Sequence, residues 1–260
     1  MDLQLAGKTA IVTGASKGIG LAITTALVNE GVTVIAGARS SSAELEALGD
    51  AVRFIPVDLS TSDGPAALVA EAGDGLDILV NNVGALVPRT AGFLAITDSD
   101  WDVTLNLDLM AVVRTTRAAI PLLIKRGGGT VVTISSVNAF LPDPGVIDYS
   151  AAKAAVWNLS KSLSKEFGPQ GLRFNTISPG PVSTPLWLGD TGVAATVGKA
   201  MGVSADEARK RIIQSGGGFA TGRFTQPDEV ADLVLLLTSN RAGNVTGADI
   251  RIDGGFTKEL

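Results

Sequence analysis

The sequence predicts an α/β protein built around one doubly wound, parallel β-sheet of about seven strands flanked by helices. Short runs rich in β-branched residues alternate with longer helical patterns along the whole chain of 260 residues. Several of these runs are apolar at nearly every position, which is typical of parallel strands covered on both faces. A glycine-rich turn at 13–20 joins the first run to the first helical pattern. Repeated β–α alternation of this kind favours a parallel sheet with right-handed crossovers.

Each apolar run marks an expected strand, and each longer helical stretch between two runs marks an expected helix. In chain order, we expect strands at 8–13, 32–37, 52–57, 76–80, 129–135, 172–177 and 248–252. Between them we expect helices at 19–29, 63–73, 100–124, 148–167 and 227–238. The chain has neither a Pro/Ser-rich linker nor a run of like charges, so we expect one domain over residues 1–260.

One late segment, 186–224, departs from this alternation. It contains several glycines, including a run at 216–218, and one helical pattern at 204–214. A long insertion at this point of a compact sheet is typical of a binding loop, so we expect a substrate-binding lid. Its apolar side chains have three open interpretations, because they can line a pocket, form the core of the lid or contact another subunit. They are Leu186, Trp187, Leu188, Val193, Val197 and Met201.

Composition and charge narrow the class of protein. The chain has no histidine and no cysteine, so a metal site is not expected. Its net charge of −5, without a basic block, makes nucleic acid a poor partner. A helix that spans a bilayer needs about 18 consecutive apolar residues, and no apolar run of this chain approaches that length. The first residues lack the pattern of a signal peptide. We therefore expect a soluble, cytoplasmic protein without membrane contacts, and the mean hydropathy of +0.32 favours large contacts between subunits.

The turn "TGASKGIG" (13–20) has the features of a phosphate-binding loop. Its glycines permit a tight turn and a close approach of the backbone to a ligand. The free N–H groups at the start of the following helix suit a pyrophosphate. The spacing G-x-x-x-G-x-G differs from the G-x-G-x-x-G dinucleotide pattern, and packing of helix on strand alone remains an alternative. The cofactor contacts expected from this turn are Gly14, Ser16, Lys17, Gly18, Ile19 and Gly20.

The end of the second strand indicates which dinucleotide binds. Folds that bind NAD usually place an acidic residue at this point, whereas this chain has Ala38 followed by Arg39. Arg39 can pair with a 2′-phosphate, and Lys17 can add a second cation. Either residue alone is equally consistent with a solvated surface charge. Together, and with no acid at 36–38, they predict NADP(H) rather than NAD(H).

Tyr149 is the only tyrosine of the chain, and Lys153 follows it four residues later. On a helix the two side chains share one face. A nearby ammonium lowers the pKa of a phenol from about 10, so the pair can provide a general acid–base in a chain without histidine. Taken alone, the spacing is weak evidence, and a surface tyrosine beside a surface lysine would be the favoured interpretation.

Polar or small residues follow several other strands. Ser135 and Ser136 end the fifth strand, "NNVG" (81–84) ends the fourth, and "PGPVSTP" (179–185) follows the sixth. Ligands of open α/β sheets bind at the carboxyl ends of the strands. We therefore expect these segments to form one cleft with Tyr149.

In this order and spacing, the motifs resemble those of the short-chain dehydrogenase/reductase family, over essentially the whole chain. The family's T-G-x-x-x-G-x-G motif matches 13–20, and its N-N-A-G motif matches 81–84 with Val83 in place of alanine. Its C-terminal signature matches "IDGG" (252–255). The resemblance implies a Rossmann-type, NADP-binding domain. The overall pattern is similar to 3-oxoacyl-carrier-protein reductases.

The resemblance also implies a catalytic set. The family's serine, by its spacing to the tyrosine, matches Ser136 rather than Ser135, and would hold the substrate oxygen. Tyr149 would exchange a proton with that oxygen, while Lys153 would bind ribose hydroxyls and lower the phenol pKa. The family's active-site asparagine matches Asn106 in "LNLD" and would hold a water beside Lys153. Further implied cofactor contacts are Asp58, Leu59, Asn82, Val83, Gly84, Tyr149, Lys153, Pro179, Gly180, Val182 and Thr184.

We therefore expect an oxidoreductase that transfers a hydride between NADP(H) and a small-molecule carbonyl or secondary alcohol. Reduction of a 3-oxoacyl, polyketide or small ketone is the favoured direction. One alternative is an NAD(P)-dependent dehydrogenase of a sugar, a steroid or another secondary alcohol. A second is a nucleotide-binding sensor on the same fold, which would have no need of a tuned phenol. The family resemblance and the hydropathy predict a homotetramer with the helices at 100–124 and 148–167 and the segment 248–260 at its interfaces.

Overall fold

Seven parallel strands form one sheet in the computed structural model of the protein, which describes residues 2–190, 192–214 and 218–258. The strand order is β3-β2-β1-β4-β5-β6-β7, so the chain starts within the sheet and builds outward in both directions. The expected doubly wound sheet is confirmed. The strands are β1 (Thr9–Thr13), β2 (Thr33–Ala38), β3 (Val52–Pro56), β4 (Ile78–Asn81), β5 (Gly129–Ile134), β6 (Leu172–Pro179) and β7 (Asp249–Ile252).

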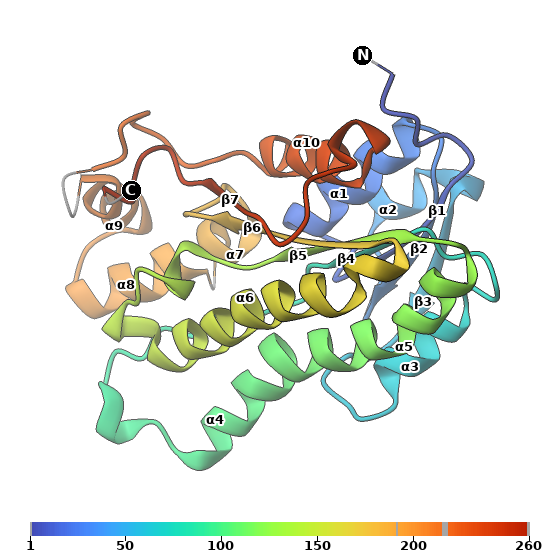
Figure 1. Ribbon diagram of the computed structural model, residues 1–260. Helices are drawn as coiled ribbons and strands as arrows, with labels where there is room; N and C mark the ends of the chain where they lie inside the picture. Colours follow the sequence, from blue (N-terminus) through green and yellow to red (C-terminus); the bar gives the residue numbers. More distant parts are fainter. Residues whose placement is uncertain (1, 191, 215–217, 259–260) are drawn as a thin grey trace.

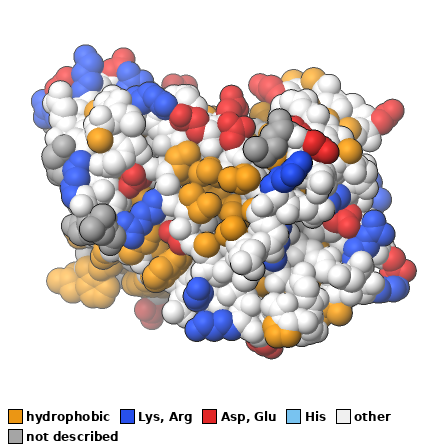
Figure 2. Space-filling view, turned by 45° about the horizontal axis from the view of Figure 1, so that its top comes forward, with side chains coloured by type: hydrophobic (Ala, Val, Ile, Leu, Met, Phe, Trp, Pro, Cys, Tyr) orange, Lys and Arg blue, Asp and Glu red, His pale blue; other side chains and the backbone are white. Residues whose placement is uncertain are grey.

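Helices cover both faces of this sheet (Figure 1). One face carries α1 (Gly18–Asn29) and α10 (Pro227–Thr238), and the other carries α3 (Gly64–Ala70), α5 (Ala111–Lys125) and α6 (Ile147–Phe167). A short helix, α2 (Ala43–Glu46), follows β2. Within the described ranges, no helix is long and apolar enough to cross a membrane. Figure 2 shows that hydrophobic side chains gather in the middle of one face of the molecule, with charged side chains around them.

Alternating residues of each central strand pack on opposite faces of the sheet. Val12 and Val80 belong to the apolar cluster beneath α1 and α10, whereas Ile11 and Leu79 belong to the cluster beneath α3 and α5. All four side chains are fully buried. Because both faces are covered, almost every strand position must be apolar, which explains the continuous apolar runs of the sequence.

The helix expected at 100–124 has a break in its winding. Its first part, α4 (Asp98–Leu105), begins at a capping box in which Thr97 and Asp100 each accept a backbone N–H of the other. A π-helical turn (Asn106–Met110) follows and leads directly into α5. A π-turn holds more residues than an α-turn, so it changes which side chains face the neighbouring α6.

The segment expected to be a lid contains three helices. The pattern at 204–214 corresponds to α9 (Ala205–Gln214), while α7 (Pro185–Leu188) and α8 (Val193–Met201) are additions to the expected elements. Residues 191 and 215–217, which include the first two glycines of the run, lie outside the described residues. The three helices lie together at one end of the sheet, beside the chain that follows β7 (Figure 1).

Candidate active site

A cavity of about 1630 Å³ opens at the carboxyl ends of the parallel strands. Its walls include residues at or just after the ends of β1, β2, β4, β5 and β6, together with the start of α6 and parts of α7, α8 and α9. The strand ends therefore meet in one cleft, as the sequence predicts. The position agrees with the rule that open α/β sheets bind ligands at this edge.

The glycine turn forms one wall of the cavity, and its geometry requires glycine. Gly14 and Gly18 have φ values of +67° and +56°, in the left-handed region that side chains disfavour. A Cβ atom on Gly20 would lie 2.1 Å from the carbonyl oxygen of Gly14. Gly20 thus serves close packing, whereas Gly14 and Gly18 shape the turn whose N–H groups open α1. This cradle fits a dinucleotide pyrophosphate.

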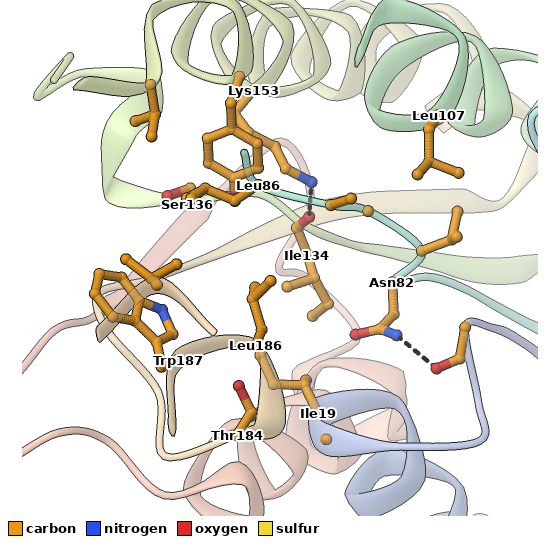
Figure 3. A pocket seen from close by; sticks show the side chains of 18 of the residues that line it. Ile19, Asn82, Leu86, Leu107, Ile134, Ser136, Lys153, Thr184, Leu186 and Trp187 are labelled. Carbon is orange, nitrogen blue, oxygen red and sulfur yellow. Dashed lines mark hydrogen bonds between the residues drawn. The ribbon is translucent and has the colours of Figure 1, made fainter. Parts of the chain in front are cut away.

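The loop after β4 is tied to this turn by hydrogen bonds. Asn82 donates its side-chain amide to the carbonyl oxygens of Thr13 and Gly14, at 2.9 and 3.2 Å (Figure 3). The Thr13 hydroxyl accepts the backbone N–H groups of Asn82 and Val83. Asn82 therefore fixes the relative position of two strand ends, a structural role in addition to the cofactor contact that the resemblance implies.

Two exposed cations lie on the part of the cavity wall that follows the neighbouring strands β1 and β2. Lys17 and Arg39 both line it, and Asp58 and Leu59 lie in the same part of the wall. Hydrogen bonds from Ser60 lower the pKa of Asp58, and the nearby Arg39 guanidinium lowers it further. The residues in this part of the wall suit an adenosine that carries a 2′-phosphate.

The loop after β6 approaches the glycine turn from the other side. Gly180 has no room for a side chain, because its Cβ would lie 2.9 Å from that of Asp253. Thr184 lies against Gly18, where a Cβ would meet the threonine methyl at 3.3 Å. Pro179, Val182 and Thr184 line the cavity. The expected cofactor residues thus border the cavity, except Gly20, which packs against Gly14 and is not part of the wall.

The two serines after β5 have different surroundings. The Ser135 hydroxyl is buried and donates to the carbonyl oxygen of Lys153 in α6, at 3.3 Å. The Ser136 hydroxyl accepts the backbone N–H of Asn138 at 3.2 Å and lies beside the Asn138 side chain. Ser136 (Figure 3) is within the cavity wall, and Tyr149 lines the same cavity. Ser135 also borders the cavity, but its hydroxyl is engaged by the carbonyl of Lys153, and the choice of Ser136 over Ser135 stays a prediction.

Tyr149 and Lys153 share one face of α6, as their spacing predicts. The Lys153 side chain is only 4% exposed, and its Nζ lies 5.4 Å from the centre of the Tyr149 ring. Nζ donates a hydrogen bond of 3.2 Å to the carbonyl oxygen of Ile134 (Figure 3). The lysine is thus held in place by β5, beside the phenol.

The pKa of Tyr149 is higher than that of a free phenol, contrary to the expected lowering. Burial raises this pKa, and the Asp108 carboxylate raises it further. The Lys153 ammonium and a hydrogen bond with Ser136 lower it, as expected, but not enough to reverse the direction. The site therefore favours the protonated phenol.

The structure does not bring Asn106 to Lys153. The Asn106 amide donates to the carbonyl oxygen of Asp102 at 2.9 Å, and its oxygen accepts a hydrogen bond from Arg114 at 3.1 Å. The residue that faces Lys153 from this turn is Asp108, whose Oδ1 lies 3.6 Å from Nζ. The π-helical turn is the physical reason why Asn106 does not reach Lys153. The winding of this turn places Asp108, rather than Asn106, toward α6.

Asp108 is a buried acid that the sequence reasoning missed. It is 1% exposed and accepts the backbone N–H of Ala85 at 3.2 Å. Burial raises its pKa to about 6, although Lys153 and the Ala85 N–H act in the opposite direction. A Cβ on Gly84 would lie 2.6 Å from Oδ1, so glycine is required there for the approach. The available signal was an acid within the apolar stretch 107–111.

The start of α6 is anchored by a second buried ion pair. Arg89 donates from Nε to Asp148 at 3.1 Å and from Nη1 to Asp100 at 3.0 Å. Thr104 of α4 also donates to Asp148, at 2.7 Å. The Asp148 side chain is 2% exposed and directly precedes Tyr149. This network fixes the end of the helix that carries the phenol.

The opposite wall of the cavity is apolar. Leu186 and Trp187 of α7 lie across the pocket from Ser136 and Lys153 (Figure 3). Val193 and Val197 of α8 also line it, whereas Leu188 and Met201 are largely exposed outside the wall. Ile212, Phe256 and Lys258 are lining residues that the sequence did not indicate. Four of the six apolar residues of this segment therefore line the pocket, which was one of the three interpretations left open by the sequence.

Comparisons with known proteins agree with this site. A family model described as short chain dehydrogenase matches residues 8–190. The chain is 34% identical over 263 residues to the 3-oxoacyl-[acyl-carrier-protein] reductase FabG of Thermotoga maritima, with 98% of this chain and 99% of the relative covered. It is 35% identical over 270 residues to the D-threitol dehydrogenase of Mycolicibacterium smegmatis, with 98% and 95% covered.

Solved structures give the same result. L-sorbose reductase from Gluconobacter frateurii, complexed with NADPH and L-sorbose, superimposes with a TM-score of 0.90 at 32% sequence identity, and each chain is covered fully. The aldohexose dehydrogenase of Thermoplasma acidophilum superimposes with a TM-score of 0.86 at 28% identity, with 100% of this chain and 98% of that chain covered. The motifs, the sheet order and these matches lead to one conclusion. The protein is an oxidoreductase that belongs to the short-chain dehydrogenase family.

Proposed function

We propose that the protein reduces a ketone to a secondary alcohol with NADPH and catalyses the reverse oxidation with NADP⁺. The observation that carries the proposal is the meeting of Ser136, Tyr149 and Lys153 in one corner of the cavity, beside the glycine turn. A nucleotide-binding sensor would need the turn, but it would gain nothing from a half-buried phenol held beside an ammonium. The geometry therefore supports an enzyme rather than a binding protein.

In the proposed reaction, each residue has a distinct task. NADPH, when bound, supplies the hydride to the carbonyl carbon. The Ser136 hydroxyl donates a hydrogen bond to the carbonyl oxygen and orients the substrate. Tyr149 then donates its phenolic proton to that oxygen, and its raised pKa keeps it protonated until this step. Lys153 stabilises the phenolate that remains and recruits the next proton through its ammonium group.

The preference for NADP(H) is supported by charge. Lys17 and Arg39 lie exposed at one end of the cavity, in reach of a 2′-phosphate. Ala38, the last residue of β2, leaves no acid to pair with a free 2′-hydroxyl. NADPH in the structure of L-sorbose reductase, to which the chain is similar, is in line with this preference.

The substrate is proposed to be a free small molecule rather than a carrier-bound acyl chain. A carrier protein is acidic and needs a basic surface beside the cleft. Arg89 is only 12% exposed and is engaged by Asp100 and Asp148. Lys125 and Arg126 lie at the C-terminal end of α5, where they pair with Asp74 and Asp77. Each of these three cations is therefore paired with an acid of this chain.

A polyhydroxy ketone is a second candidate substrate. Asn138 and Asp143 line the wall that faces the apolar residues of α7, so one side of the pocket can bind hydroxyl groups. The likeness to D-threitol dehydrogenase and L-sorbose reductase favours the same class. The pocket thus suits a ketone with one apolar and one polar end.

Three further proposals concern the whole chain. We propose that residues 1–260 act as one domain. Within it, the segment 186–224 would close over the substrate, because Leu186 and Trp187 already line the cavity. We also propose that the chain assembles as a homotetramer. A cytoplasmic location, expected from its composition, remains a prediction.

A panel of carbonyl compounds tests the proposed function. Aliphatic and aryl ketones, a steroid ketone, L-sorbose and a 3-oxoacyl thioester are each incubated with NADPH or NADH, and loss of the reduced cofactor is followed by absorbance. Turnover of a small or polyhydroxy ketone with NADPH is the expected result. A protein that binds NADPH tightly but turns over none of these compounds would be a sensor, and the proposal would fail.

A further inference from the structure

The π-helical turn places a carboxylate against the lysine of the site. Oδ1 of Asp108 lies 3.6 Å from Nζ of Lys153, and both side chains are almost completely buried. The backbone N–H of Ala85 and the close approach of Gly84 hold the carboxylate in this position. A buried acid held beside a buried ammonium forms a neutral pair, and a neutral pair has a much weaker electrostatic effect on its neighbours than an isolated charge.

We propose that Asp108 is a positioning residue that sets the proton state of Tyr149 by neutralising Lys153, and thereby poises the site for ketone reduction. This inference rests on the proposed function only in naming Tyr149 as the proton donor. Lys153 alone would stabilise the phenolate, which is the form that alcohol oxidation needs. With Asp108 beside it, the Lys153 ammonium stabilises the phenolate less, and Tyr149 keeps the proton that ketone reduction needs.

The other charges around Asp108 do not provide this effect. Tyr149 and Asp148 on α6 are the further titratable groups whose charges interact with it, and Asp148 is compensated by its ion pair with Arg89. On α5, Arg114 hydrogen-bonds to Asn106 and to the carbonyl oxygens of Ser60 and Thr61, away from this pair. Asp108 is thus the acid whose charge opposes Lys153 at the phenol.

The direction in which Asp108 shifts the pKa of Tyr149 follows from the order in which the two groups lose their protons. The pKa of Asp108 is about 6, so the carboxylate is ionised throughout the alkaline range in which a phenol loses its proton. Removing the Asp108 charge should therefore lower the pKa of Tyr149. Below about pH 6 Asp108 becomes neutral, but the phenol is far from its own titration there.

A chain with one tyrosine allows a direct test. Tyrosinate absorbs in the near ultraviolet, and Tyr149 is the only phenol of the protein. The protein is titrated to alkaline pH without cofactor or substrate, and circular dichroism at each point defines the range in which it stays folded. Tyr149→Phe gives the background. Asp108→Asn keeps the size of the side chain and an oxygen for the Ala85 N–H, and it removes only the charge.

We expect the tyrosinate signal of Asp108→Asn to appear at least about 1 pH unit below that of the native protein. Asp108→Glu, which retains the charge, should stay near the native value. Asp98→Asn removes an exposed acid from α4 and should also leave the curve unchanged. An unchanged or higher pKa in Asp108→Asn would overturn the proposal. Should that variant fail to fold, Asp108→Ser tests the same loss of charge.

The kinetic readout separates this inference from the proposed function. In Asp108→Asn, the pH profile of kcat for alcohol oxidation should shift to lower pH, while the profile of Lys153→Met should shift to higher pH. The optical titration needs no turnover, so it remains decisive even for a protein that proves inactive. A low pKa of Tyr149 in Asp108→Asn without any ketone reduction would uphold the inference about Asp108 and reject the proposed function.

Discussion

Arg39 is the residue on which the choice of cofactor depends. It follows β2 directly and lies at the end of the cavity, where a 2′-phosphate would accept its charge. Ala38→Asp combined with Arg39→Ser should shift the preference toward NADH, because the acid pairs with a ribose 2′-hydroxyl and repels the phosphate. A lost charge-assisted hydrogen bond costs about 1.5–3 kcal/mol, so NADPH affinity should fall by about ten- to a hundredfold.

Titration calorimetry with both cofactors measures this change. Arg53→Ser is the matched control, since Arg53 is half exposed on β3 and pairs with Glu71. Its affinities should equal those of the native protein. Equal affinity of the native protein for NADH and NADPH would contradict the proposed role of Arg39.

The individual residues show where sequence reasoning ends. Ser136, Tyr149 and Lys153 meet in the structure because their spacing is set by a strand end and one regular helix. Asn106 and Asp108 are different, since which of them faces Lys153 depends on the winding of one turn. The sequence contains no mark of that π-turn, and in the structure Asn106 contacts Arg114 whereas the more deeply buried Asp108 contacts Lys153. The raised pKa of Tyr149 follows first from burial of the phenol and then from the charge of the same missed acid.

At the scale of elements, α6 depends on how its first turn is held. Arg89 bridges Asp148 to α4, and removing one partner leaves the other charge buried and unpaired. Arg89→Met should therefore destabilise the protein by about 3 kcal/mol, as is typical of a broken buried pair. For a chain of this size, that loss lowers Tm by about 6–12 °C. Thermal unfolding followed by circular dichroism measures it.

The same substitution at an exposed pair is the control for this prediction. Arg209 on α9 pairs with Asp206 at 3.9 Å, and both side chains are largely exposed. Arg209→Met should change Tm little, because exposed pairs contribute little to stability. Equal losses in the two variants would mean that α6 is not anchored by the network around Asp148.

The elements themselves follow the sequence closely, apart from the π-turn within 100–124 and the short helices α2, α7 and α8. The strands and the helices on both faces of the sheet are marked by apolar runs and helical spacing, and the structure confirms them. The helices α7 and α8 were not expected, because 186–203 is rich in glycine and its apolar residues contact the cavity rather than one continuous core. A helix that faces a pocket does not show the pattern of one that faces a core.

At the scale of the whole molecule, exposed apolar residues predict the assembly. Trp157 on α6 is 40% exposed and Leu236 on α10 is 41% exposed, and the two helices lie on opposite faces of the sheet. The hydrophobic patch of Figure 2 adds a surface that water disfavours. The proposed homotetramer needs two kinds of twofold interface, and the faces that carry Trp157 and Leu236 are our candidates for them.

Light scattering at micromolar concentration should give four times the chain mass of 26.5 kDa. Trp157→Arg should disrupt contacts along α6 and leave dimers joined through the remaining interface. Lys199→Arg on α8, which keeps the charge and adds no apolar contact, should leave the tetramer intact. A native protein that scatters as a monomer would contradict the assembly proposed.

The central claim is that Tyr149 donates the proton during ketone reduction, and kcat of Tyr149→Phe tests it most directly. The substitution keeps the ring, its packing and the helix, and it deletes one hydroxyl. General acid catalysis contributes about 10²–10⁴-fold, so kcat should fall by at least 10²-fold while NADPH affinity changes little. A Tyr149→Phe enzyme with near-native turnover would show that the proton comes from another group and that the only tyrosine of the chain is structural.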